Sequence, residues 1–236
     1  MKATAVAPSN IAFIKYWGKK DEALRIPENG SISMNLSNLQ TTTTVEFDEK
    51  YTEDHVEYNG VEEKIEGNRE VKHVNRIRAF AKTRLCAKVV TQNNFPSGTG
   101  LSSSASGFAA LTVAGAKAAG LSLSEKDLSI LARQGSGSAC RSIPDGFVEW
   151  LDGETSDTSY AVSLHSPEYW DIVDVVAIVD IHKKDIPTTA GQILHTSSPF
   201  FPVRLGRMKE KIAQCKQYIA EKNFTIQEKY LKSKFL

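Results

Sequence analysis

The chain has 236 residues, of which 41% are hydrophobic and 24% are charged. This length allows one large domain or two smaller ones with a substantial buried core, and the composition is ordinary for a globular protein. Because the formal net charge is +1, no overall field favours nucleic acid or a membrane surface as a partner. No apolar run approaches the roughly 20 residues of a membrane span, and the first residues lack the apolar core of a signal peptide.

The cysteines are Cys86, Cys140 and Cys215, which are widely spaced and form no CxxC pair. Their odd number argues against a disulfide framework, and their spacing argues against a metal cluster. We therefore expect the protein to work in the reducing cytoplasm.

The N-terminal stretch combines structural and chemical signals. Residues 3–7 predict a short strand, and the apolar residues after it end in a Lys, Tyr and Trp cluster that Gly18 closes. A strand edge whose lysines extend into water would explain this pattern. Asn10, Tyr16 and Lys19 can instead offer an amide, a phenol and an ammonium group to an anionic ligand. The stretch alone leaves both interpretations open.

The next segments predict structure without chemistry. Residues 41–47 alternate threonine with apolar side chains, as in a half-buried strand. The Asn-Gly pair at 59–60 predicts a hairpin with a type I′ turn. Apolar residues at helical spacing predict a helix over 69–84. We interpret the two histidines here, His55 and His73, as surface or core residues.

A Gly/Ser loop at 96–104 separates a predicted strand from an Ala-rich helix predicted over 105–119, which Gly120 ends. Gly98 and Gly100 leave backbone N–H groups unobstructed near the helix N-terminus. The macrodipole is positive there, and serine hydroxyls can reach phosphate oxygens or a metal ion. The loop is neither a P-loop nor a dinucleotide fingerprint. By itself it fits a phosphate site or a flexible connector.

A second Gly/Ser loop, residues 135–142, follows a helix that Ser124 and Asp127 open with a capping box. Its hydroxyls can donate hydrogen bonds, and the Arg141 guanidinium can bind a phosphate or carboxylate through two N–H groups. This pattern predicts a second anion site.

The last third of the chain predicts one strand and one long helix. Val173 to Val179 is a continuous apolar run that favours a strand. After Ser197-Ser198-Pro199-Phe200-Phe201, apolar side chains recur every three or four residues, which indicates a helix with one buried face. These side chains are Leu205, Met208, Ile212, Cys215 and Ile219.

Three motifs resemble signatures of the GHMP small-molecule kinase superfamily and, within it, the mevalonate diphosphate decarboxylase family. In chain order they are Ser9-Asn10-Ile11-Ala12-Phe13-Ile14-Lys15-Tyr16-Trp17-Gly18-Lys19, the loop Pro96 to Ser106, and Gly135 to Ser142 continued by Gly146-Phe147-Val148-Glu149-Trp150. Residues 27–36 are similar to that family's substrate-facing segment. The resemblance covers most of residues 3–150 and then thins.

The resemblance implies an α+β fold of the GHMP-kinase type. A complete N-terminal mixed α/β domain over 1–170 would carry the ATP and substrate sites, and an incomplete C-terminal α+β domain would occupy 171–236. Because the second sheet would lack strands, we expect an exposed apolar face that leads to aggregation or to pairing, the latter as a homodimer.

The resemblance also implies a reaction. Family members use ATP to phosphorylate the tertiary hydroxyl of mevalonate diphosphate, and then lose phosphate and carbon dioxide to give isopentenyl diphosphate. ATP and Mg²⁺ would be the cofactors and a phosphorylated mevalonate the small-molecule partner, with neither nucleic acid nor membrane involved. Catalytic roles would fall on Lys19, Ser104 and Arg141.

Two residue sets follow from the motif match. The ATP phosphates would contact Thr91, Pro96, Ser97, Gly98, Thr99, Gly100, Leu101, Ser102, Ser103, Ser104 and Ser106, with Mg²⁺ near Ser103 and Ser104. The substrate would contact Asn10, Tyr16, Lys19, Ser136, Ser138, Arg141, Thr188 and Thr189. Asn10 would position the substrate carboxylate against Arg141.

Three departures from the family pattern keep alternatives open. Thr189 stands where the family usually has an arginine that binds the diphosphate. Losing that contact would weaken a diphosphate ligand by about 1.5–3 kcal/mol and favours a related kinase that does not decarboxylate. Asp145 lies where the family has a glycine, which brings a carboxylate near a phosphate site. The family's Asp-Ala-Gly-Pro-Asn segment does not occur in these 236 residues, which favours a shortened decarboxylase with reduced turnover, or a non-catalytic nucleotide-binding remnant.

Overall fold

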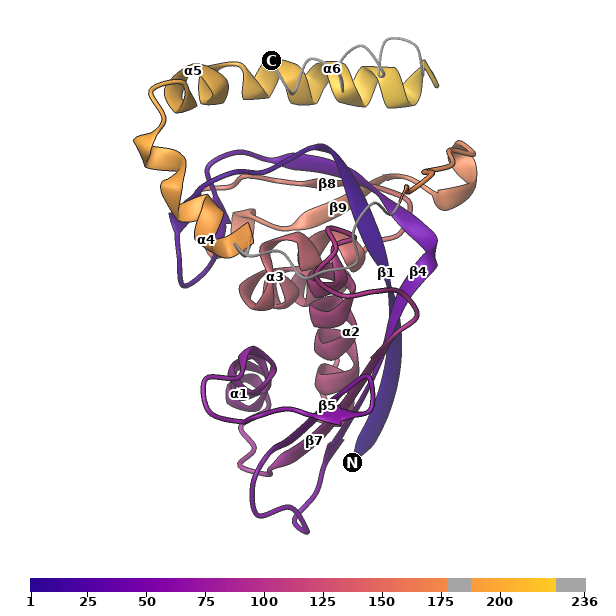
Figure 1. Ribbon diagram of the computed structural model, residues 1–236, viewed down its shortest axis with the longest axis vertical. Coiled ribbons are helices and arrows are strands. Elements are labelled where there is room, and N and C mark those ends of the chain that lie inside the picture. Colours follow the sequence, from indigo (N-terminus) through magenta and orange to yellow (C-terminus); the bar gives the residue numbers. More distant parts are fainter. Residues whose placement is uncertain (178–187, 224–236) are drawn as a thin grey trace.

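The computed structural model of the chain describes residues 1–177 and 188–223. Within these ranges, α1, α2 and α3 lie on one face of a seven-stranded mixed sheet (Figure 1). The strands of this sheet are β1 (Lys2–Ile14), β4 (Ser31–Phe47), β5 (His55–Tyr58), β6 (Val61–Glu62), β7 (Ala87–Asn93), β8 (Phe147–Trp150) and β9 (Ala161–His165), and a separate ribbon pairs β2 (Lys19–Asp21) with β3 (Ile26–Pro27). The α-helices are α1 (Arg69–Ala81), α2 (Ser103–Ala118), α3 (Glu125–Gly135), α4 (Thr188–Ile193), α5 (Phe201–Gly206) and α6 (Met208–Ala220). The 3₁₀ helices are η1 (Gly137–Ser142), η2 (Ser156–Thr158), η3 (Pro167–Tyr169) and η4 (Leu194–Ser197).

The central strand β4 is long enough to pair with two different strands along one of its edges. Its first residues pair with β8 and its last residues pair with β7, while β1 runs antiparallel along most of its length. The register of β1 shifts between Pro8 and Ser9. At this shift the in–out alternation is lost, so that both Ser9 and Asn10 are buried. The irregularity therefore turns two polar side chains inward.

The local predictions for the N-terminal half are confirmed. Residues 41–47 alternate between buried and more exposed positions within β4. Asn59 and Gly60 both have positive φ (50° and 80°), as a type I′ turn requires. The helix predicted over 105–119 is observed at Ser103–Ala118, and Ser124 forms a capping box with Asp127 at the start of α3.

Helix α2 packs closely because small residues face its neighbours. A side chain at Gly115 would meet Ile77 of α1, since its Cβ would lie 2.5 Å from Cδ1 of that residue. His73 of α1 lies in the same core, where its Nε2 is 2.8 Å from Thr112 Oγ1. Burial lowers the pKa of His73 to about 3, so this residue is neutral at physiological pH. Its interpretation as a core residue is confirmed.

The strand predicted over Val173 to Val179 is wrong in its described part, because residues 173–177 form no strand. Val173 and Val175 are 77% and 86% exposed. A strand needs a neighbour that accepts and donates backbone hydrogen bonds, and the described residues supply none to this segment. Residues 178 and 179 lie outside the described ranges.

Helices α5 and α6 cross one end of the sheet (Figure 1). The predicted apolar face is confirmed on α6, where Met208, Cys215 and Ile219 are buried against a cluster that includes Phe13 and Phe147. The single long helix of the prediction is wrong, because the structure divides it after Gly206 and leaves Leu205 on α5. No helix of the described residues has the length and apolar character that crossing a bilayer requires. Further exposed apolar side chains in this part of the chain are Ile193, Leu194, Phe200 and Val203.

Candidate active site

The first Gly/Ser loop connects β7 to α2 and leaves the N-terminus of this helix open. Gly98 and Gly100 have φ of +78° and +98°, and Ser102 has φ of +57°. The left-handed conformation disfavours a serine, and the Ser102 side chain makes no capping hydrogen bond. First-turn N–H groups of α2 therefore remain free of a side-chain cap, next to the half-exposed Ser103 and the exposed Ser104. This arrangement suits phosphate oxygens.

Buried hydroxyl groups of β1 and β4 form hydrogen bonds with this loop and with the start of α2. Ser9 Oγ donates to the carbonyl of Leu101 at 2.5 Å, and Thr41 Oγ1 lies 2.6 Å from Ser106 Oγ. Thr91 Oγ1 is 3.1 Å from Thr43 Oγ1. The hydroxyls of Thr91 and Ser106 thus bond within the protein: that of Thr91 joins β7 to β4, and that of Ser106 holds the start of α2 against β4.

The tip of the loop is tied to the neighbouring strands. Ser97 Oγ hydrogen-bonds the hydroxyl of Tyr58 on β5, and Asn93 Nδ2 donates to both groups, at 3.0 Å and 2.6 Å respectively. Thr99 Oγ1 donates to the carbonyl of Pro96 at 3.1 Å. These bonds keep Pro96 to Thr99 in a defined conformation beside the helix end.

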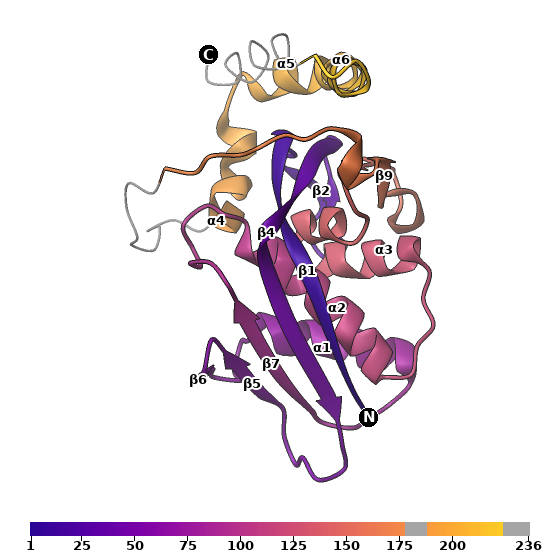
Figure 2. The same ribbon diagram turned by 90° about the vertical axis from the view of Figure 1, so that its right-hand side faces the viewer.

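The structure brings the two Gly/Ser loops together, although about 30 residues separate them in the sequence. Ser136 Oγ donates to Ser104 Oγ at 3.3 Å, which joins the start of α2 to the segment that continues into η1. Figure 2 shows α2 and α3 side by side behind the sheet. The two predicted anion sites therefore adjoin each other.

Arg141 on η1 is the charged group of the second loop, and it is almost fully buried. Its side chain is 3% exposed and donates from Nε to Ser33 Oγ at 3.0 Å, and from Nη1 to Ser31 Oγ at 2.6 Å. Its Nη2 donates to Asn10 Oδ1 at 3.1 Å, while Asn10 Nδ2 donates to Ser142 Oγ at 2.8 Å. Burial lowers the pKa of Arg141, and these recorded partners are all neutral.

Aromatic side chains line the other side of Arg141. Tyr16 packs edge-on against Trp150 with ring centroids 4.7 Å apart, and the Arg141 guanidinium lies 6.0 Å from the Trp150 ring. Burial raises the pKa of Tyr16, against a hydrogen bond from the side chain of Gln192 on α4 and the charge of Arg141. A Cβ at Gly137 would lie 2.6 Å from Tyr16 Oη, so the loop must have glycine there.

Other predicted substrate residues occupy distinct positions. Lys19 is buried, and its Nζ pairs at 2.6 Å with Glu22, whose side chain is 66% exposed. Because Glu22 can turn into water at small cost, Lys19 is available to an anionic ligand. Ser138 is half-buried and accepts through its carbonyl from Asn10 at 3.2 Å. Thr188 opens α4, but its side chain and that of Thr189 lie outside the described part of the structure.

Further side chains beside the predicted residues complete the site. Ser31 and Ser33 are two residues apart on a strand and so share one face, a signal that would have placed them together. Gln192 lies outside the motifs. Asp145 is exposed in the turn before β8, where Gly146 is required because a Cβ would lie 2.2 Å from the His165 carbonyl.

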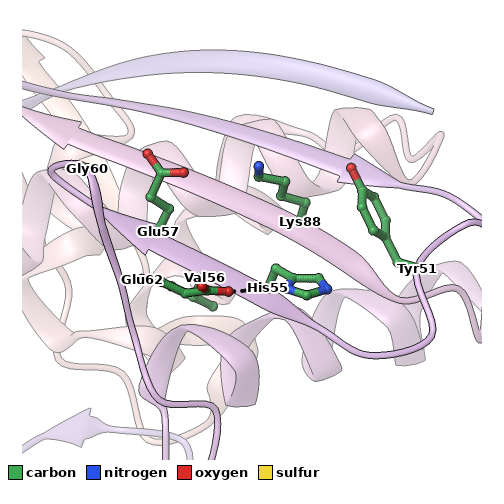
Figure 3. A pocket seen from close by; sticks show the side chains of 7 residues that line it. All are labelled: Tyr51, His55, Val56, Glu57, Gly60, Glu62 and Lys88. Atoms are coloured by element: carbon green, nitrogen blue, oxygen red, sulfur yellow. Dashed lines mark hydrogen bonds and ion pairs between the residues drawn. The ribbon is translucent and has the colours of Figure 1, made fainter.

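Figure 3 shows a separate pocket of about 390 Å³ at β5 and β7. Its lining residues are Tyr51, His55, Val56, Glu57, Gly60, Glu62 and Lys88. It includes none of the predicted site residues. Its mixture of acidic and basic side chains does not single out one sign of ligand.

The fold and the two joined loops define the class of the protein: a GHMP-type fold whose helix N-terminus and buried arginine suit two anionic ligands. The family model of the diphosphomevalonate decarboxylase-like N-terminal domain matches residues 7–161. The chain belongs to this family.

Curated relatives and solved structures indicate the same family. The chain is 42% identical to diphosphomevalonate decarboxylase of Ganoderma lucidum over 80% of its length and 52% of that protein, and 38% identical to the Candida albicans enzyme over 94% of its length and 66% of that protein. It matches mevalonate diphosphate decarboxylase of Staphylococcus aureus with a TM-score of 0.88 at 38% identity, covering 98% of this chain and 71% of that one. A family member solved with MVAPP, AMPPCP and magnesium gives a TM-score of 0.89 at 36% identity, over 99% and 72% of the chains. The predicted family and fold are confirmed, and the chain spans about half to two thirds of these curated relatives.

Proposed function

We propose that the protein takes part in the ATP-dependent decarboxylation of mevalonate 5-diphosphate to isopentenyl diphosphate, a step of the mevalonate pathway of isoprenoid biosynthesis. The observation that carries this proposal is Arg141. A guanidinium that is 3% exposed and bonded to neutral groups keeps an uncompensated charge in a medium of low dielectric. A ligand carboxylate placed against it would supply the missing negative charge.

The residues at the first loop fit the phosphates of a nucleotide. Free N–H groups at the start of α2, the positive φ of Gly98 and Gly100, and the hydroxyls of Ser103 and Ser104 all favour phosphate oxygens. Mg²⁺ usually binds to phosphates and a few protein oxygens, and these two hydroxyls would provide such oxygens. When bound, ATP supplies the phosphoryl group that makes the tertiary hydroxyl a leaving group.

The chain's own residues would then bind and orient the substrate. Arg141, held by Ser31, Ser33 and Asn10, would fix the carboxylate, so that its C–C bond lies in place to break as the C–O bond to phosphate breaks. Lys19 would approach the substrate phosphates when Glu22 turns away. Because Ser104 and Ser136 are in contact, the two ligands would lie side by side, as direct phosphoryl transfer requires.

A related kinase that phosphorylates without decarboxylation is a second candidate, favoured by Thr189 at a position where the family usually has arginine. Product analysis separates the two. The protein is incubated with Mg-ATP and either mevalonate 5-phosphate or mevalonate 5-diphosphate, and ADP and carbon dioxide are measured. We expect both products from the diphosphate. ADP without carbon dioxide would identify the kinase, and neither product with either substrate would count against both activities.

A further inference from the structure

A buried hydroxyl group of β1 reaches the first Gly/Ser loop from a distant part of the sequence. Ser9 is 0% exposed, and its Oγ donates to the carbonyl of Leu101, 92 positions away, at 2.5 Å. The register of β1 shifts between Pro8 and Ser9, and register shifts of this kind often redirect a side chain next to a functional site. Here the shift accompanies a serine that bonds to the loop before α2.

This hydrogen bond fixes the peptide group between Leu101 and Ser102. The C=O and N–H of a planar trans peptide group point in opposite directions, and the described residues contain no cis peptide bond. Because the Leu101 carbonyl points to Ser9 on β1, the N–H of Ser102 points away from β1. Within residues 1–177 and 188–223 this N–H donates to no other protein group. It is therefore open to a ligand at the start of α2.

The backbone of Ser102 is strained in this arrangement. Its φ is +57°, in the left-handed region that residues other than glycine seldom adopt. Its side chain forms no capping hydrogen bond that would offset the strain. If the peptide group turned over, so that its C=O and N–H exchanged directions, φ of Ser102 would become negative and the strain would be relieved. The hydrogen bond from Ser9 opposes this rotation, because it breaks when the Leu101 carbonyl leaves β1.

The two orientations of this peptide group would act on an anion in opposite ways. In the observed orientation the Ser102 N–H adds to the free N–H groups at the N-terminus of α2, where the macrodipole is positive. In the reversed orientation the Leu101 carbonyl would face the same place, and its partial negative charge would repel phosphate oxygens. The direction of one peptide group therefore decides how well the first loop binds phosphate.

The next residue of β1 contacts the other loop. Asn10 accepts from Arg141 Nη2 at 3.1 Å and donates to Ser142 Oγ at 2.8 Å. Adjacent residues at the register shift thus bond to different Gly/Ser loops. Removing the Ser9 hydroxyl leaves the hydrogen bonds of Arg141 in place, so its effect should be confined to the first loop.

We propose that Ser9 is a positioning residue for nucleotide binding, because its hydrogen bond keeps the Ser102 N–H directed at the phosphates. This inference rests on the proposed function, in which the first loop binds the phosphates of ATP. Ser9 acts through the backbone of the loop and does not itself contact the nucleotide.

The test compares S9A and S9T with the parent protein. Magnesium and AMPPCP, a non-hydrolysable ATP analogue, are titrated by calorimetry in the presence of saturating mevalonate 5-diphosphate, so that no turnover occurs. The loss of one hydrogen bond to a charged phosphate corresponds to about tenfold to a hundredfold in affinity, and we expect this loss in S9A. S9T keeps the hydroxyl and should bind the analogue about as tightly as the parent. The affinity for mevalonate 5-diphosphate alone should stay unchanged in both variants.

S129A is the matched control for a merely structural role. Ser129 is also 0% exposed, and its Oγ donates to a backbone carbonyl, that of Cys140, at 3.3 Å. Both S9A and S129A should lower the melting temperature, since each removes a buried hydrogen bond. S129A should nevertheless keep the parent's affinity for the analogue, because Ser129 does not touch the first loop.

Three results would overturn the inference: an unchanged affinity of S9A for the analogue, an equal loss in S9A and S129A, or an equal loss in S9A for the analogue and for mevalonate 5-diphosphate. If S9A melts below the assay temperature, S9T and S9V give the same comparison, because valine has a methyl group where threonine has the hydroxyl. A parent protein that does not bind the analogue would instead refute the proposed nucleotide site.

Discussion

Replacing Arg141 with methionine should separate ligand binding from folding. Methionine fills a similar length without charge. The substitution removes three hydrogen bonds from a charged donor to neutral side chains, a loss of about 5–9 kcal/mol at about 1.5–3 kcal/mol each. It also removes a desolvated charge whose burial costs several kcal/mol. The two effects offset each other, so the free protein should keep a melting temperature within a few degrees of the parent.

Substrate binding, unlike the melting temperature, should change strongly in the Arg141→Met protein. Truncating one partner of a buried charge pair costs about 2–5 kcal/mol, so the affinity for mevalonate 5-diphosphate should fall by about 30-fold to several thousandfold. Titration calorimetry measures this loss, and Mg-ATP binding checks that the first loop is intact. Unchanged affinity for the substrate would show that Arg141 does not contact it.

Arg133 provides a matched comparison, because it is equally buried but donates to backbone carbonyls of Leu24 and Ser156 at 2.9 and 3.1 Å, and to that of Ser159. Arg133→Met also removes a buried charge, but it takes a donor from the buried carbonyl of Ser159, which cannot turn to another partner as the hydroxyls of Ser31 and Ser33 can. A buried group left without its partner costs about 1–3 kcal/mol, in addition to the charge-assisted hydrogen bonds that are lost. We therefore expect the R133M protein to be strongly destabilised. Similar melting temperatures for R141M and R133M would contradict the assignment of one arginine to a ligand and the other to the fold.

Three further predictions concern pH, the first loop and the second loop. The pKa of His73 is about 3 in the folded protein and about 6.5 when unfolded, so the unfolded state binds an extra proton between these values. Stability should fall by about 4–5 kcal/mol as the pH drops from 6.5 to 3, and denaturation curves of H73L should lack this contribution. Thr41→Val should lower the free energy of unfolding by about 1–3 kcal/mol, because Asn93 Oδ1 and Ser106 Oγ lose their buried partner; an unchanged denaturation midpoint would refute this. Gly137→Ala should weaken substrate binding in titrations and spare Mg-ATP binding, since its Cβ would lie 2.6 Å from Tyr16 Oη; equal effects on both ligands would contradict it.

Local chemistry explains which features were predictable from the sequence. The alternation in residues 41–47, the Asn-Gly turn and the capping box of α3 each depend on neighbours a few residues away, and all three were found. Residues 173–177 show the limit of such reasoning. Their apolar run favours a strand, but a strand exists only where another segment pairs with it, and the run itself contains no information about that partner.

Contacts over long sequence distances explain what was missed in the site. Arg25 is a single basic residue in a turn, and only the fold shows that its Nε donates to the carbonyl of Gln134, which is 109 positions away. Ser31 and Ser33 share one strand face by simple alternation, yet only the fold shows that this face points at Arg141. The sequence motifs therefore predict where the loops are. Which charged and polar side chains come together at the loops is decided by long-range packing and could not be predicted from the motifs.

The C-terminal helices also belong to the site, although the family model ends at residue 161. Gln192 on α4 is buried and hydrogen-bonds Tyr16, and Arg204 on α5 donates at 2.8 Å both to Asn29 Oδ1 and to the carbonyl of Lys15. Lys15 adjoins Tyr16, and Asn29 lies two residues before Ser31, one of the groups that hold Arg141. These contacts connect the described C-terminal segment to Tyr16 and to the start of the strand that carries Ser31. The helices that follow residue 187 therefore help to orient Tyr16 and the strand that holds Arg141, and substrate binding should depend on their docking as well as on the two Gly/Ser loops.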